Sequence, residues 1–159
     1  MESQQPDYRE RSPQVTSWYS EFEVLSEEEC LSLLARVEYG RVAVVTADGH
    51  PEIFPVNFAL EGRSVVFSTG SRLLIARAPL GHIAFETDSI DPTTHEGWDV
   101  VVSGEGGDIT DSIDEGSVTA RSHPIVHWAP GEKDRWITIV NPSFHGRRLY
   151  VPAPHAKDA

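Results

Sequence analysis

Small hydroxyl side chains, a glycine and an arginine stand together in the stretch FSTGSRLLIARAP, where a strand-like run passes into a short helical turn. The polar and flexible residues of this stretch are Ser68, Thr69, Gly70, Ser71 and Arg72. A helix N-terminus offers unpaired backbone N–H groups and the positive end of the helix dipole. Hydroxyls add donors, glycine lets a ligand approach the backbone, and arginine adds a charged fork of N–H groups. The stretch predicts a site for one phosphate monoester; the alternative is an ordinary turn with Ser71 as the N-cap.

Other side chains have the chemistry to hold a planar ring. Asn57 is polar within the otherwise apolar run PVNF, and its amide or the backbone around it is suited to the polar edge of a ring. The alternative is a strand asparagine that faces solvent. Trp98 and Trp136 are suited to stacking on a flat cofactor, and the alternative for both is packing in the core.

Metal and nucleophile motifs are not recognised in the sequence. His123 and His127 are four residues apart, but Pro124 lies between them and neither an HExxH motif nor a cysteine pair accompanies them, so no metal site is expected. Cys30 fits a small core residue better than a reactive thiol. There is no GxSxG, Walker or GxGxxG motif, and no catalytic residue is assigned.

The elements that position these residues begin with a helix. Ser26 and Glu29 have the spacing of a capping box, and an apolar face with period 3.6 follows, so a helix is expected over 26–38 with Gly40 as its stop.

After Gly40 the period changes to two, which is typical of strands. Strands are expected over 41–47, 51–60, 64–69, 82–88, 98–110 and 135–142, with a closing strand over 144–151 and a short inserted helix over 71–78. The glycines within 98–110 indicate a bulge. Residues 111–130 are the least regular part of the chain, with room for a short helix before residue 123. About six antiparallel strands with helical trim predict a mainly β fold, a small Greek-key type barrel whose closure removes sheet edges.

Composition places the chain among globular proteins with one domain. The 159 residues are 39% hydrophobic and 24% charged, and residues 18–150 are expected to form the domain between flexible tails at 1–17 and 151–159. A net charge of −12 disfavours nucleic acid as a partner. No apolar run is long enough to span a membrane and no signal core is present, so neither membrane insertion nor secretion is expected. The single cysteine suits a reducing compartment, and a cytoplasmic location is expected.

Several runs in unbroken order resemble one known family. LSEEECLSLLARVEYGRVAVV, DGHPEIFPVNFALEGRSVVFSTGSRLL, GWDVVVSGEG and HWAPGEKDRWITI are similar to the pyridoxamine 5'-phosphate oxidase-like, flavin-binding split β-barrel proteins, over about residues 23–148. No single motif among these runs is specific for the family, but their order along the chain is.

The resemblance implies a homodimer with FMN in a groove at the subunit interface. It implies that the phosphate is held by residues 68–72, that the isoalloxazine lies along Val56, Asn57 and Phe58, and that residues of the late strands approach from the partner subunit, with Trp98 and Trp136 as candidates. It further implies a flavin-dependent oxidoreductase with a small-molecule electron donor and acceptor. The alternatives are a non-catalytic flavin- or haem-binding protein and a deazaflavin-dependent reductase on the same fold.

The sequence departs from the family pattern in three places. Arg72 stands where many relatives have lysine, and both cations hold phosphate. Asp99 follows Trp98 where relatives commonly have serine, and a carboxylate there would oppose an anionic cofactor. The C-terminal arginine–histidine motif that binds substrate phosphate in true pyridoxamine phosphate oxidases is not found in FHGRRLYVPAPHAKDA, so that reaction is not expected.

Overall fold

The computed structural model describes residues 21–72 and 80–152, which are mainly β. The elements in chain order are β1 (Glu21–Leu25), α1 (Glu27–Leu34), β2 (Tyr39–Val45), β3 (Pro51–Glu61), β4 (Ser64–Thr69), β5 (His82–Ile90), β6 (Gly97–Asp108), α3 (Glu115–Arg121) and β7 (Arg135–Tyr150). Most of the inserted helix predicted over 71–78 lies outside the described residues, as do the tail predicted over 1–17 and nearly all of that over 151–159.

Six strands close into a barrel. The hydrogen-bonded order is β7-β4-β3-β2-β5-β6, every pairing is antiparallel, and β6 pairs again with β7 to complete the ring. The predicted meander of β2, β3 and β4 is confirmed, and its two tight turns use Gly49 and Gly62 at φ of 85° and 58°. The mainly β antiparallel barrel expected from the sequence is therefore confirmed.

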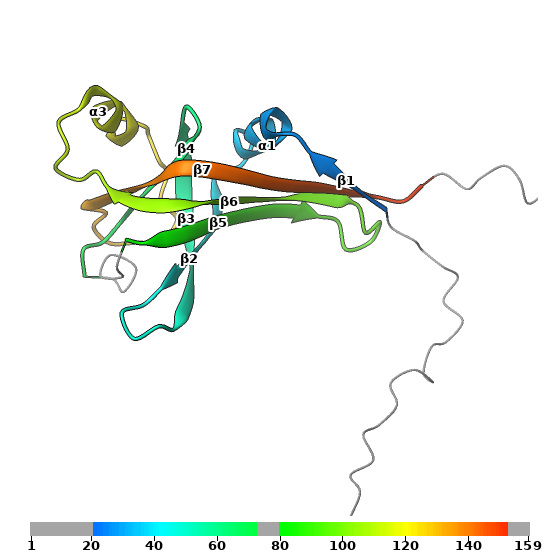
Figure 1. The fold of residues 1–159 in the computed structure, drawn as a ribbon, viewed down its shortest axis with the longest axis horizontal. Helices are drawn as coiled ribbons and strands as arrows, with labels where there is room; N and C mark the ends of the chain where they lie inside the picture. Colours follow the sequence, from blue (N-terminus) through cyan, green and yellow to red (C-terminus); the bar gives the residue numbers. More distant parts are fainter. Residues whose placement is uncertain (1–20, 73–79, 153–159) are drawn as a thin grey trace, which may run out of the picture.

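Strand β7 is the longest of the described elements and pairs with three other strands. It runs the length of the molecule in Figure 1, pairs with β6 along its course, with β4 near its start and with β1 near its end. The sequence predicted two strands here, and the structure has one that continues through Pro142. Proline is tolerated because it lies where the β6–β7 register shifts between Ser103 and Glu105, the bulge that the glycines of β6 predicted.

Helix α1 begins as predicted and ends earlier. The capping box is present: the Glu29 N–H donates to the Ser26 hydroxyl at 3.3 Å, and the Ser26 N–H donates to the Glu29 carboxylate at 2.9 Å. The helix ends at Leu34, not at residue 38, and Gly40 is a residue of β2 rather than a helix stop. A side chain has no room at Gly40, because a Cβ there would lie 2.3 Å from the Phe85 ring.

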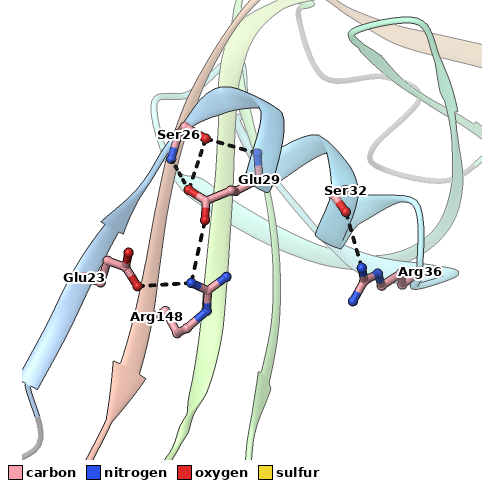
Figure 2. A network of polar contacts seen from close by, with 6 residues as sticks. All are labelled: Glu23, Ser26, Glu29, Ser32, Arg36 and Arg148. Carbon is pink, nitrogen blue, oxygen red and sulfur yellow. Dashed lines mark hydrogen bonds and ion pairs between the residues drawn. The ribbon is translucent and has the colours of Figure 1, made fainter. Parts of the chain in front are cut away.

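The extra strand β1 was not expected from the sequence. It pairs with the end of β7, and an ionic network joins it to α1 (Figure 2). The Arg148 guanidinium lies 3.0 Å from the Glu23 carboxylate and 3.7 Å from the carboxylate of Glu29, which is also the capping-box residue. One arginine of β7 thus contacts both elements that precede the barrel.

The barrel interior is apolar. Phe67, Phe85, Ile137 and Ile139 are fully buried within the main cluster, and α1 adds buried residues to it. A smaller cluster lies under α3 and consists of Val66, Ile109, Ala120 and the partly buried Trp136. Within the part of the chain that the structure describes, no helix is long and apolar enough to cross a membrane.

Candidate functional site

The predicted phosphate stretch begins in the last residues of β4, where two hydroxyl side chains are buried. Ser68 and Thr69 are each 4% exposed, and the pairing of β4 with β7 places Ser68 opposite Trp136 and Thr69 opposite Arg135. The Ser68 hydroxyl lies 3.0 Å from Nε2 of His127. Both side chains are therefore buried at the end of β4, and the Ser68 hydroxyl has a partner in His127.

The turn after β4 already binds an anion that the chain supplies. The backbone N–H of Ser71 donates to Oδ1 of Asp134 at 2.7 Å, and the Ser71 hydroxyl donates to Oδ2 at 2.8 Å. These two hydrogen bonds, with the nearby charge of Arg72, hold the pKa of Asp134 below its usual value. Of the donors predicted for a phosphate, the two of Ser71 converge on one carboxylate, and the charge of Arg72 lies nearby.

A cavity of about 450 Å³ opens beside this turn. It is lined by Gly70, Ser71 and Arg72 on one side and by residues 130–134 on the other. Arg72 is exposed. The Lys133 ammonium donates to the carbonyls of residues 129, 130 and 131 at 3.1–3.2 Å, which holds that loop in a tight curve.

Residues 122–134, which we call the strap, cross the barrel wall beside the turn. The strap is fixed to three strands: His123 lies 2.7 Å from the carboxylate of Glu61 on β3, His127 contacts Ser68 on β4, and the Trp128 ring lies 4.8 Å from the Tyr39 ring of β2. Burial and the positive charge of Lys133 lower the pKa of His127. The two histidines thus have separate partners, and among the described residues no group of histidine, cysteine and acidic side chains is arranged to hold a metal ion.

The predicted ring-binding residues of β3 have three different environments. The Asn57 side-chain Nδ2 donates to the backbone carbonyl of Glu38 at 3.2 Å, and its Oδ1 accepts from the backbone N–H of Trp128 at 2.9 Å. The side-chain amide of Asn57 therefore joins the strap to the barrel. Phe58 is buried, with its ring 4.6 Å from the Phe85 ring, and Val56 packs at the edge of the core. Only Asn57 of the three places a polar side-chain group beside the strap.

The two candidate tryptophans lie at opposite ends of the β6–β7 ladder. Trp136 is opposite Ser68 and packs under α3, whereas Trp98 is opposite Arg148 near β1. The strand steps from Trp98 to Asp108, which is opposite Ile137, span roughly 30 Å at about 3.3 Å per residue. Trp136 thus lies beside Ser68, three residues before Ser71, whereas Trp98 lies at the far end of the β6–β7 ladder.

Asp99, the residue expected to oppose an anionic cofactor, forms an ion pair with Arg147 of the same chain. Nη2 and Nε of Arg147 lie 3.0 and 3.1 Å from its Oδ2, and the two residues are opposite each other on β6 and β7. The Asp99 side chain is only 14% exposed. Its charge is paired within the chain.

Sequence reasoning missed the strap residues that contact the site. His127 and Asp134 lie in HWAPGEKD, which has neither strand nor helix periodicity, and the contacts to Ser68 and Ser71 join residues about 60 positions apart. The one available signal was the concentration of polar and aromatic types in an irregular stretch just before a strand.

Comparison with known proteins agrees with the barrel fold. The model of the family described as pyridoxamine 5'-phosphate oxidase matches residues 26–148. The chain belongs to this family. The uncharacterized protein Rv0080 of Mycobacterium tuberculosis is 33% identical over an alignment of 130 positions that covers 78% of this chain and 83% of that relative.

Two solved structures of similar chains support the family assignment. A structure described as the FAD binding protein from Mycobacterium smegmatis is 30% identical, with a TM-score of 0.65 over 80% of this chain and 99% of the other. A putative pyridoxamine 5'-phosphate oxidase from Corynebacterium glutamicum is 25% identical, with a TM-score of 0.67 over 83% of this chain and 96% of the other. Both likenesses extend over nearly the whole of the other chain.

Proposed function

We propose that this member of the family binds a flavin nucleotide, FMN in the first instance, with the flavin phosphate on the turn of Ser68–Arg72. The observation that carries the proposal is the pair of hydrogen bonds from the Ser71 N–H and hydroxyl to one carboxylate, beside the charge of Arg72. Donors that converge on a carboxylate have the geometry and polarity that a phosphate requires. The likeness to an FAD-binding protein of M. smegmatis supports a flavin as the ligand.

The rest of the flavin is proposed to lie along β3, beside Asn57. This residue is the nearest polar side chain of β3 to the turn, because Phe58 pairs with Phe67, the neighbour of Ser68. Pairing of Asp99 with Arg147 removes the opposing charge that the sequence had indicated. The residues present therefore fit a flavin phosphate at the turn and tolerate an anionic cofactor near β6.

A homodimer is part of the proposal. Trp98 lies roughly 30 Å along the β6–β7 ladder from the turn, and we propose that a second subunit presents its own Trp98 to the flavin, as the family resemblance implies. Two-fold symmetric dimers are the commonest homo-oligomers of soluble proteins. Light scattering at micromolar protein with FMN present should give twice the 17.6 kDa mass of one chain; the mass of one chain would refute the dimer.

The activity proposed is that of a flavin-dependent oxidoreductase with a small-molecule electron donor and acceptor. A bound flavin supplies the electron chemistry, and the residues of this chain bind it, orient it and shield one side from water. A reducing, cytoplasmic compartment is proposed from the single, buried Cys30.

Reconstitution tests the cofactor. Purified protein is mixed separately with FMN, FAD, riboflavin, a deazaflavin or haem, freed of excess ligand and examined by absorption. Retained flavin bands with FMN, and weaker retention of riboflavin, are expected because riboflavin lacks the phosphate. A Soret band, or retention of a deazaflavin in place of all three flavins, would refute the proposal. Bleaching by NADPH or NADH, with recovery on adding an acceptor, then tests turnover; a flavin that no donor reduces would refute the oxidoreductase.

A further inference from the structure

Asp134 occupies both hydrogen-bond donors of Ser71. Its two carboxylate oxygens accept separately from the backbone N–H and from the hydroxyl, at 2.7 and 2.8 Å. A phosphate bound at this turn needs the same two donors, and one donor set cannot serve two anions at such distances. The carboxylate and a phosphate are therefore mutually exclusive there.

The neighbouring charges do not remove this competition. The two Ser71 hydrogen bonds, with the charge of Arg72, lower the pKa of Asp134 and so favour its ionised form. The Lys133 ammonium is turned onto three backbone carbonyls of the strap. An ionised Asp134 that stayed at the turn would repel a phosphate.

The geometry also gives Asp134 a way out. It is exposed, so its side chain can rotate into water, and the rest of the strap has its own attachments to Ser68 and Asn57. Release of Asp134 therefore does not require the strap to detach from the barrel.

We propose that Asp134 is a built-in competitor that occupies the phosphate position until a phosphorylated flavin displaces it. This rests on the proposed function. Asp134 makes binding of FMN weaker than an open turn would allow, and it has no such effect on riboflavin. The residue is thus a determinant of how strongly the protein distinguishes phosphorylated from unphosphorylated flavin.

The test is titration of FMN and riboflavin into wild type, Asp134→Asn and the control Glu132→Gln, followed by quenching of flavin fluorescence. Glu132 lines the same cavity and loses the same charge, but no hydrogen bond joins it to Ser71. Asp134→Asn should tighten FMN binding by about five- to tenfold, the effect of one charge at contact distance in a hydrated site. Riboflavin binding, and FMN binding by Glu132→Gln, should change less than about twofold.

Inorganic phosphate is a second probe that needs no flavin. The Ser71 amide resonance should respond to phosphate at lower concentration in Asp134→Asn than in wild type, and equal concentrations would overturn the proposal. Wild type that binds FMN while Asp134→Asn binds it no more tightly would overturn the role of Asp134 alone. Wild type that binds neither FMN nor FAD would refute the proposed function, and this inference with it. Thermal melts of both variants check that the fold is kept.

Discussion

Replacing Gly146 by alanine should loosen the attachment of α1 to the barrel. Gly146 is a buried residue of β7, and a Cβ built on it would lie 2.5 Å from Sγ of Cys30 and 3.1 Å from Cβ of Leu25. Favourable contacts between such atoms occur at about 3.5–4.0 Å, so α1 would have to move by about 1 Å. Cys30 is 1% exposed and cannot turn away into solvent.

The expected cost is that of overpacking a closed core, about 1–3 kcal/mol. For a protein of this size that corresponds to a fall in melting temperature of roughly 2–12 °C. Urea unfolding followed by circular dichroism measures the free energy directly. Gly81→Ala is the matched control, because among the described residues, its two chain neighbours apart, no atom lies within 4 Å of a Cβ at Gly81.

A double variant tests the cause. Cys30→Ala removes the sulfur atom that Gly146→Ala would strike, so the double variant should be more stable than the sum of the two single effects by at least about 1 kcal/mol. If Gly146→Ala unfolded with the free energy of wild type, or if the two effects were additive, the packing of α1 against β7 described above would be wrong.

The remaining predictions concern the turn and the strap. Arg72→Ala should weaken FMN binding by roughly tenfold to a hundredfold for each charged hydrogen bond lost, with riboflavin unchanged, as measured by titration. Asn57→Ala should lower the free energy of unfolding by about 1–2 kcal/mol and shift Trp128 fluorescence to the red, because two hydrogen bonds of the amide are lost. Stability should fall as pH drops below the unfolded histidine value of about 6.5 towards the lower folded pKa of His127, since the unfolded chain binds more protons in that window. Melts between pH 7.5 and 5 should show a smaller slope in His127→Gln.

Each of these has a contrary result. If Arg72→Ala bound FMN as tightly as wild type, Arg72 would not contact the flavin phosphate, and the turn would have no role in binding it. Asn57→Asp keeps an oxygen that accepts from the backbone N–H of Trp128, so its free energy of unfolding should fall less than that of Asn57→Ala. Equal falls in the two variants would contradict the role given to that hydrogen bond. Identical pH slopes in His127→Gln and wild type would show that His127 is not the titrating group.

The barrel was predictable because its signals are local. Alternating residues and the Asp48–Gly49 turn define β2 and β3 within a few residues of each other, and the structure has both. The start of α1 was equally local, since the capping box lies within four residues. Its end was not, because Gly40 serves a contact with Phe85, which is distant in sequence.

Strand β1 could not have been found from its own residues. Four of its five residues are exposed, so no buried face marks it, and only pairing with the end of β7 makes it a strand. The same reason explains the two strands predicted for β7: Pro142 reads as a strand end until the bulge opposite it is known.

The candidate site also has residues that the sequence could reveal and residues that it could not. Ser68–Arg72 could be selected by residue type, because hydroxyls, a glycine and an arginine are informative by themselves. Asp134 and His127 could not, since their importance depends on where the strap crosses the barrel wall. Trp98 was selected by residue type and assigned to the partner subunit by resemblance, and its place at the far end of the β6–β7 ladder follows from the strand register.

The long strand β7 also determines when this protein can fold during synthesis. It supplies partners to β1, β4 and β6, which are made earlier and would otherwise present open edges. A nascent chain that has not yet emerged through residue 150 lacks the strand that closes the ring, so its sheet is open at both sides. Folding must therefore follow the emergence of β7, and until then the exposed edges are the kind of surface that chaperones protect from aggregation.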